Sequence, residues 1–200
     1  DCLRYGMQLK FIPRQEYANK EIASFLDELN SEFGEFLLIP EGGYDPLGAK
    51  GAALIMDLVS DNNYTHIVSA TGTATTLAGL LLGSKNDQKI IGVNVLKGIS
   101  DTFQRLNYLC VTEVKPEKVL ILDEYHFGGY AKYNAELIAF MNDCWASFQL
   151  PLDFVYTAKM LYGIFGEIRK GNIAKGSKIL CLHTGGLAGN RSLTTGTLSY

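Results

Sequence analysis

Short apolar segments alternate with longer segments of helical periodicity along most of this chain. Runs of strand length lie at 36–39, 66–70, 89–95, 118–122 and 178–182, and a weaker alternation covers 7–12. Between them, apolar residues recur at the spacing that predicts helices over 14–29, 48–58, 77–82, 99–109, 134–148 and 158–170. Strands that alternate with helices are typical of βαβ units. The pattern therefore predicts an α/β fold, with a mostly parallel open sheet and helices on both faces.

Several loops follow the carboxyl ends of these predicted strands, where ligands bind in parallel sheets. They are Glu41-Gly42-Gly43, 71–76, 123–133, Tyr156-Thr157 and His183 to Gly186. One site can collect all of them. Thr157 is also the expected N-cap of the helix over 158–170, which Gly171 would end.

The segment 66–83 reads as a buried strand, a turn of small residues and the start of a helix. The turn, Thr71-Gly72-Thr73-Ala74-Thr75-Thr76, contains four threonines and no charge. A helix start offers free backbone N–H groups and a positive dipole end, which together favour an anion such as phosphate. A tight turn that needs small residues only for packing is the alternative. The hydroxyl donors favour phosphate.

Composition excludes several classes of protein. The net charge is −3, with no basic stripe to neutralise a nucleic-acid backbone. No apolar run approaches the roughly 20 residues that span a bilayer, and no signal peptide is visible. The four cysteines are scattered, as are the three histidines. We therefore expect a cytoplasmic protein with free thiols, no metal site, no membrane partner and no nucleic-acid partner.

The threonine-rich turn does not match the two commonest phosphate motifs. No Gly-Lys-Ser/Thr follows it, so it is not a Walker loop. Gly72 and Gly79 are too far apart for a dinucleotide fingerprint, and no acidic residue closes the next strand. A mononucleotide or a phosphorylated cofactor remains. Hydroxyl groups with tyrosines nearby suit pyridoxal 5'-phosphate.

Five motifs together are specific. Glu41-Gly42-Gly43, 71–79, Tyr130, Val155-Tyr156-Thr157 and His183-Thr184-Gly185-Gly186 occur in this order and at this spacing. They resemble the C-terminal part of the pyridoxal-phosphate family that holds 1-aminocyclopropane-1-carboxylate deaminase and D-cysteine desulfhydrase (fold type II, tryptophan-synthase-β-like). The resemblance runs over essentially the whole chain. It implies a pyridoxal-phosphate-dependent lyase or deaminase, a small amino-acid substrate and a homodimer.

The resemblance also implies roles for individual residues. The cofactor phosphate would be held by Thr73, Ala74, Thr75 and Thr76, and the pyridine nitrogen by Thr184, beside Gly185. Tyr130, Tyr156 and Thr157 would lie at the substrate. Tyr156 and Tyr130 would be catalytic residues, with Tyr156 acting in proton transfer or attack. From the residues alone, Tyr130 could equally be a packing aromatic of its loop, Tyr156 a core tyrosine and Thr184 a turn cap. We expect His66, His126 and His183 to be structural.

Two positions depart from the ring-opening deaminases of the family. Those enzymes carry an acidic residue where this chain has Thr157, and they tend to have an apolar residue where it has Thr184. Both differences resemble D-cysteine desulfhydrase. We therefore predict D-cysteine as the substrate, giving pyruvate, ammonia and sulfide. The alternative is 1-aminocyclopropane-1-carboxylate, giving 2-oxobutanoate and ammonia.

The family's covalent cofactor lysine and its Ser-Asn-His stretch have no counterpart in this sequence. The lysines nearest the candidate loops, Lys50, Lys97, Lys132 and Lys159, lie in no matching context. The resemblance thus predicts a fragment that is inactive alone. Residues 1–33 would end a small domain, and 34–200 would form most of a large, cofactor-binding one. A complete chain would instead be a non-catalytic α/β module that binds a phosphorylated small ligand.

Overall fold

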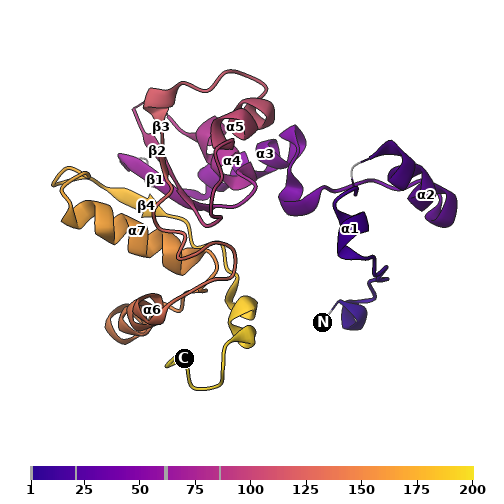
Figure 1. Ribbon diagram of the computed structural model, residues 1–200. Helices are drawn as coiled ribbons and strands as arrows, with labels where there is room; N and C mark the ends of the chain where they lie inside the picture. The colour runs from indigo at the N-terminus through magenta and orange to yellow at the C-terminus, as the bar shows by residue number, and fades with distance from the viewer. Residues whose placement is uncertain (1, 21, 61–62, 86) are drawn as a thin grey trace. The chain divides into compact units, whose positions relative to one another are not determined.

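The computed structural model describes residues 2–20, 22–60, 63–85 and 87–200 (Figure 1). The chain divides into two compact units, Asp1–Ile39 and Pro40–Tyr200. The division lies six residues after the domain boundary that the sequence predicts. Which domain of a family member each unit represents stays a prediction.

The described residues of the first unit form two α-helices, α1 (Arg14–Tyr17) and α2 (Ala23–Phe33), where the sequence predicts one. Turns at Asn19 and Ile22 interrupt the predicted helix. The strands predicted over 7–12 and 36–39 are wrong, because these residues are irregular. Phe11 is 89% exposed and Leu37 is 86% exposed. Apolar patterning favours a strand only where another strand is available to pair with it.

The second unit is built on a parallel sheet in the order β3-β2-β1-β4. The strands are β1 (His66–Thr71), β2 (Lys89–Asn94), β3 (Val119–Leu122) and β4 (Ile179–Cys181). β1 lies centrally and pairs with both β2 and β4. All four strands fall where apolar runs predict them, because strands covered on both faces read as short continuous apolar segments.

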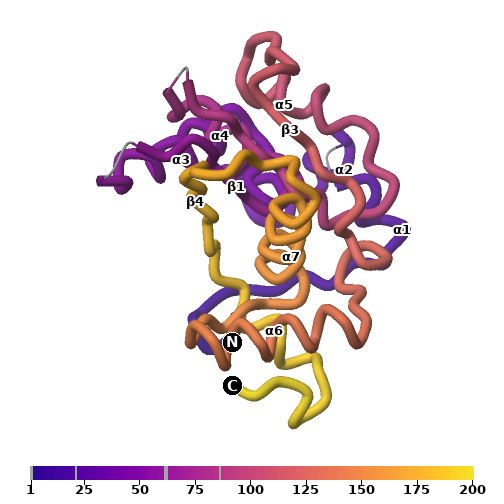
Figure 2. Tube along the Cα trace, turned by 90° about the vertical axis from the view of Figure 1, so that its left-hand side faces the viewer, coloured from indigo at the N-terminus to yellow at the C-terminus, as the bar shows by residue number. Residues whose placement is uncertain are grey.

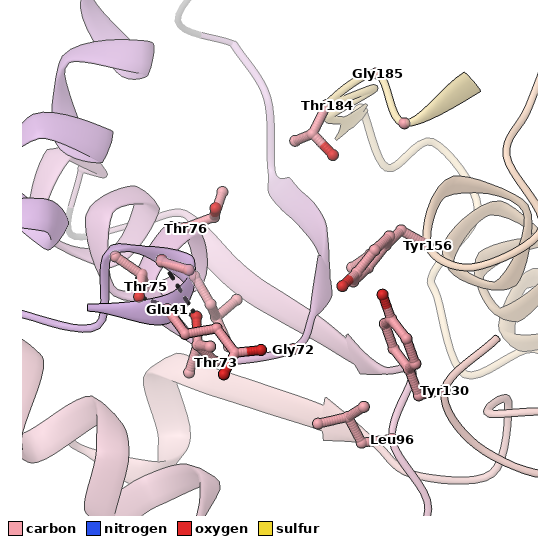
Figure 3. Close-up of a pocket in the computed structure, with 15 residues that line it drawn as sticks. Glu41, Gly72, Thr73, Thr75, Thr76, Leu96, Tyr130, Tyr156, Thr184 and Gly185 are labelled. Carbon is pink, nitrogen blue, oxygen red and sulfur yellow. Dashed lines mark hydrogen bonds between the residues drawn. The ribbon is translucent and has the colours of Figure 1, made fainter. Parts of the chain in front are cut away.

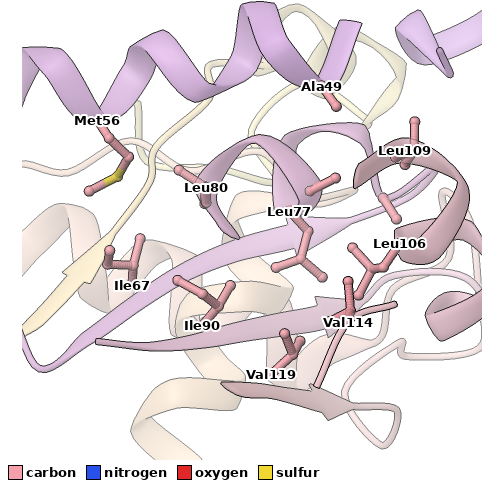
Figure 4. Packing of buried hydrophobic residues seen from close by; sticks show 12 residues of the cluster. Ala49, Met56, Ile67, Leu77, Leu80, Ile90, Leu106, Leu109, Val114 and Val119 are labelled. Carbon is pink, nitrogen blue, oxygen red and sulfur yellow. The ribbon is translucent and has the colours of Figure 1, made fainter. Parts of the chain in front are cut away.

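Helices cover both faces of this sheet, as predicted (Figures 1 and 2). The first face carries α3 (Pro46–Ala53), α4 (Thr75–Gly83) and α5 (Thr102–Cys110), with a 3-10 turn, Leu54–Leu58, after α3. Their side chains join those of β1 and β2 in the core cluster of Figure 4. The other face carries α7 (Thr157–Arg169), and α6 (Ala135–Phe148) packs against α7.

The helix that begins at the threonine-rich turn, α4, packs closely on α3. A Cβ at Gly79 would lie 2.4 Å from Ala52 Cβ. We therefore expect Gly79→Ala to lower the free energy of unfolding by about 1–3 kcal/mol, the usual effect of overpacking. Gly51→Ala is the matched control, because Gly51 lies in α3 with no atom within 4 Å of an added Cβ.

Helix propensity alone should make the Gly51 variant neutral or more stable by up to about 1 kcal/mol. Denaturant unfolding of both variants measures the difference. Equal effects would contradict the close approach of α3 and α4.

Candidate functional site

A pocket of about 500 Å³ lies at the carboxyl end of β1 (Figure 3). This volume is within the usual range for small-molecule sites. All five predicted loops contribute to it, so their convergence is confirmed. The lining residues are Glu41, Gly42, Ala70, Gly72, Thr73, Ala74, Thr75, Thr76, Leu77, Leu96, Tyr130, Tyr156, Thr184, Gly185 and Gly186.

The start of α4 forms a cup on one side of this pocket. Ala74 precedes the helix with φ +73°, a left-handed conformation that bends the chain sharply into the first turn. In the described structure, the backbone N–H groups of 73–76 make no backbone hydrogen bond. The first turn of α4 also carries no acidic residue. The cup therefore keeps the free donors and the positive helix end that an anion requires.

Threonine hydroxyls and a nearby glycine complete the cup. Thr73 Oγ1 lies 3.0 Å from Thr75 Oγ1 and donates to the Gly42 carbonyl over 3.5 Å. Gly42 has φ +65°, and a Cβ there would lie 2.7 Å from Thr73 Oγ1. A side chain at position 42 would displace Thr73. The Glu41-Gly42-Gly43 loop therefore shapes the cup from outside the helix.

Two tyrosines form the opposite part of the pocket, with their hydroxyls facing each other (Figure 3). The rings of Tyr130 and Tyr156 pack edge to face with their centroids 6.2 Å apart. Burial raises the pKa of Tyr156 to about 12, and the charge and hydrogen bond of Tyr130 add to the rise. Weaker contributions come from Asp153 and Glu41. Tyr156 therefore holds its proton at neutral pH and can donate a hydrogen bond.

Asp153 fixes the backbone from which Tyr156 projects. Its side chain is 1% exposed. One carboxylate oxygen accepts from the N–H of Val155 at 3.0 Å and of Tyr156 at 2.8 Å. The other accepts from the N–H of Thr157 at 2.9 Å and from its hydroxyl at 2.6 Å. A carboxylate with four donors is held rigidly, and it favours a helix start.

This arrangement corrects two expectations for Thr157. The helix begins at Thr157, and the capping side chain is the carboxylate of Asp153, four residues earlier. Thr157 is fully buried with its hydroxyl on Asp153, and it does not line the pocket. The expectation that it contacts the substrate does not match this geometry. An aspartate just before a helix was the available signal, since aspartate and threonine both cap helices.

Thr184 and Gly185 reach the pocket from the segment that follows β4. The imidazole of His183 stabilises this turn through two hydrogen bonds to the backbone. Its Nε2 lies 2.8 Å from the Pro151 carbonyl, and its Nδ1 accepts from the Gly185 N–H at 3.2 Å. His183 is thus bonded to the backbone on both sides, which fits the structural role expected for it.

Among the described residues that line the pocket, none is a lysine. Lys50, Lys97 and Lys132 are exposed on the surface. Lys159 is completely buried, and its ammonium donates to the Gly129 carbonyl at 2.7 Å. The sequence points to these four lysines as the nearest ones, and the structure brings none of them into the lining.

Comparison with known proteins identifies several that are similar to this chain. No protein-family model matches the chain. A protein of Pyrococcus horikoshii, described as a "putative 1-aminocyclopropane-1-carboxylate deaminase", is 33% identical over 82% of the chain. Proteins of Pyrococcus furiosus and Thermotoga maritima with the same description are 31% and 30% identical over 84% and 92% of it. A crystal structure of an ACC deaminase homologue superposes with a TM-score of 0.79 and 28% identity over 94% of the chain.

The chain is similar to these proteins over most of its length. This similarity confirms the resemblance predicted from the five motifs and the predicted α/β fold. The chain spans 53%, 56% and 63% of the three curated relatives and 62% of the solved homologue. A crystal structure of O-ureido-L-serine synthase, with a TM-score of 0.56 and 12% identity, shares the fold alone. None of the described helices is long and apolar enough to cross a membrane.

Proposed function

We propose that this chain is the cofactor-binding part of a pyridoxal-phosphate-dependent enzyme that releases ammonia from a small amino acid. The observation that carries the proposal is the pocket, in which a helix-start cup of free N–H groups faces a pair of tyrosines. The names of the similar proteins support a deaminase.

The residues present fit the cofactor at both ends. The cup at 73–76 supplies N–H and hydroxyl donors for a phosphate, and Thr184 supplies a neutral hydroxyl for the pyridine nitrogen. Bound there, pyridoxal phosphate would withdraw electrons from Cα of an amino acid. No described lysine lines the pocket, so the covalent attachment would come from outside the described lining.

The tyrosines supply the protein's own proton chemistry. Because its pKa is raised to about 12, Tyr156 carries its proton at Oη and can deliver it to a substrate in the pocket. Tyr130 packs beside it, with its side chain 60% exposed, and closes the substrate end. In this account, Tyr156 is the catalytic residue that moves a proton, and Tyr130 binds the substrate and orients Tyr156.

Two lines of support differ on the substrate. The relatives' names point to 1-aminocyclopropane-1-carboxylate. Thr184 points to D-cysteine, because a neutral hydroxyl need not keep the ring nitrogen protonated, and a weaker electron sink suits elimination of a good leaving group. Thr157 no longer adds to this argument, since it lies outside the pocket. The relatives' names therefore favour 1-aminocyclopropane-1-carboxylate as the substrate more strongly than the sequence alone does.

Product analysis separates these substrates. The natural protein, at its full length and supplied with pyridoxal phosphate, is offered each amino acid. D-cysteine and water would give pyruvate, ammonia and sulfide, and the cyclopropane acid and water would give 2-oxobutanoate and ammonia. We expect a 2-oxo acid from at least one. If neither forms while pyridoxal phosphate still binds, the non-catalytic module is the better account.

We also propose a homodimer and a cytoplasmic location, which the family resemblance and the composition imply. Light scattering of the purified protein tests the first, and cell fractionation tests the second.

A further inference from the structure

The first turn of α7 carries a lysine where the core would ordinarily hold an apolar residue. Lys159 is 0% exposed, and its side chain is the largest fully buried one among the described residues. Burying an ammonium is costly unless it is well paired. Asp153 is the carboxylate that acts on it, but both oxygens of Asp153 are already engaged by other donors.

The ammonium of Lys159 is bonded to the loop that carries Tyr130. It donates to the carbonyl of Gly129, the residue directly before Tyr130, at 2.7 Å. The other hydrogen bonds described for backbone groups of 126–132 stay within the loop: Gly128 N–H to His126 Nδ1, Gly129 N–H to the His126 carbonyl, and Lys132 N–H to the Gly129 carbonyl. The side chain of Tyr130 hydrogen-bonds to Tyr156. Among the described residues, Lys159 therefore provides the hydrogen bond that joins the backbone of this loop to α7.

The loop needs such a tie. Gly128 and Gly129 have φ values of +96° and +116°, and glycine has access to more backbone conformations than other residues, so local propensity does not fix the backbone before Tyr130. Tyr130 is 60% exposed, so its contacts with Tyr156 are supplemented by little burial. Lys159 lies one helical turn from Tyr156 in sequence. The start of α7 thus carries Tyr156 directly, and through the buried ammonium of Lys159 it also binds the backbone next to Tyr130.

The geometry points to Lys159 as a positioning residue whose ammonium, from inside the protein, holds the backbone before Tyr130 so that Tyr130 stays beside Tyr156. The effect on chemistry rests on the proposed function, whereas the tether itself does not. The bound group is a carbonyl of this chain, so Lys159 contacts neither cofactor nor substrate.

The energetics favour a positioning role over simple packing. Burial lowers the pKa of Lys159 to about 8, and Asp153 opposes the shift. A folded-state pKa below the unfolded value means that burial destabilises the protein below pH 8. The penalty is relieved between pH 8 and the unfolded pKa, because the unfolded chain there binds more protons. A methionine of similar length would avoid the penalty, so the lysine lowers stability in order to supply its hydrogen bond.

Amide hydrogen exchange of the natural protein, without substrate, tests the tether. We expect Lys159→Met to accelerate exchange over 128–132 at least about tenfold, the effect of losing a bond worth about 1.4 kcal/mol. Exchange in β1 and β2 should change much less. Lys132→Met is the matched control, because Lys132 is an exposed lysine of the same loop. Unchanged exchange over 128–132 in Lys159→Met would overturn the proposal.

A second variant covers poor folding of the methionine protein. Lys159→Gln keeps an N–H donor one atom shorter and removes the charge. Protection of 128–132 in this variant close to wild type supports the hydrogen bond as the cause. Two outcomes would overturn the proposal. In the first, both variants fold and Lys159→Gln loses protection of 128–132 as fully as Lys159→Met. In the second, only Lys159→Gln folds and it loses this protection.

A double-mutant cycle connects the tether to activity. We expect Lys159→Met to lower kcat about tenfold with little change in cofactor affinity, and to have almost no further effect in a Tyr130→Phe background. A purely structural lysine would lower activity equally in both backgrounds, which would contradict a role through Tyr130. If the wild-type protein turns over neither amino acid, the proposed function fails while hydrogen exchange still decides the tether.

Discussion

Replacing Thr76 by aspartate should abolish tight binding of pyridoxal phosphate without harming the fold. Thr76 is half-buried in the first turn of α4 and lines the pocket. A carboxylate there would face the phosphate at close range and occupy the positive helix end. We expect the dissociation constant to rise at least about 100-fold, equivalent to about 2.7 kcal/mol.

The same substitution should leave the protein as stable as before or more so. An acidic side chain in the first turn of a helix stabilises it by about 0.3–1 kcal/mol. Stability and cofactor affinity should therefore change in opposite directions. Thr76→Asn, of the same shape but neutral, is the control, and it should weaken binding by no more than about tenfold. Equal affinities for the Asp and Asn variants would show that the phosphate lies elsewhere.

Removing the hydroxyl of Tyr156 should have the largest effect on turnover. We expect Tyr156→Phe to lower kcat at least about 100-fold, as loss of a proton-transfer group does, with cofactor affinity nearly unchanged. Tyr133→Phe is the matched control. Tyr133 packs on Phe154 with ring centroids 5.1 Å apart, and it does not line the pocket. A Tyr156→Phe enzyme with most of its activity would reduce Tyr156 to a packing residue.

The pH profile gives a second readout for the same residue. Because burial and Tyr130 raise the pKa of Tyr156 to about 12, its neutral form dominates well past physiological pH. A tyrosine that acts as an acid should therefore cause no loss of kcat from its own ionisation below about pH 11. An alkaline limb near pH 9 that disappears in Tyr156→Phe would contradict this protonation state.

The buried sheet could be predicted from the sequence because strands covered on both faces leave short apolar runs, as at β1 and β2. The same signal failed over 7–12 and 36–39. There the residues are apolar and β-prone, but whether a partner strand exists is a property of the whole fold. The convergence of the loops at β1 followed from the parallel topology alone.

Features that depend on side-chain direction were harder to predict. The sequence predicts Thr157 as the cap of α7, whereas Asp153 caps it in the structure, because both residue types cap helices and the sequence does not show which side chain turns inward. The sequence places Lys159 near the site but does not predict its burial, since lysines are ordinarily exposed. Its position between Ala158 and Met160, both buried, was the available signal.

We propose that the backbone N–H groups of 73–76 hold the phosphate of pyridoxal phosphate. Amide resonances of the isotope-labelled protein test it most directly, when pyridoxal phosphate and phosphate-free pyridoxal are titrated in parallel. We predict large shifts at residues 73–76 with pyridoxal phosphate and small ones with pyridoxal. Resonances of 73–76 that stay unmoved at saturating pyridoxal phosphate would contradict the account.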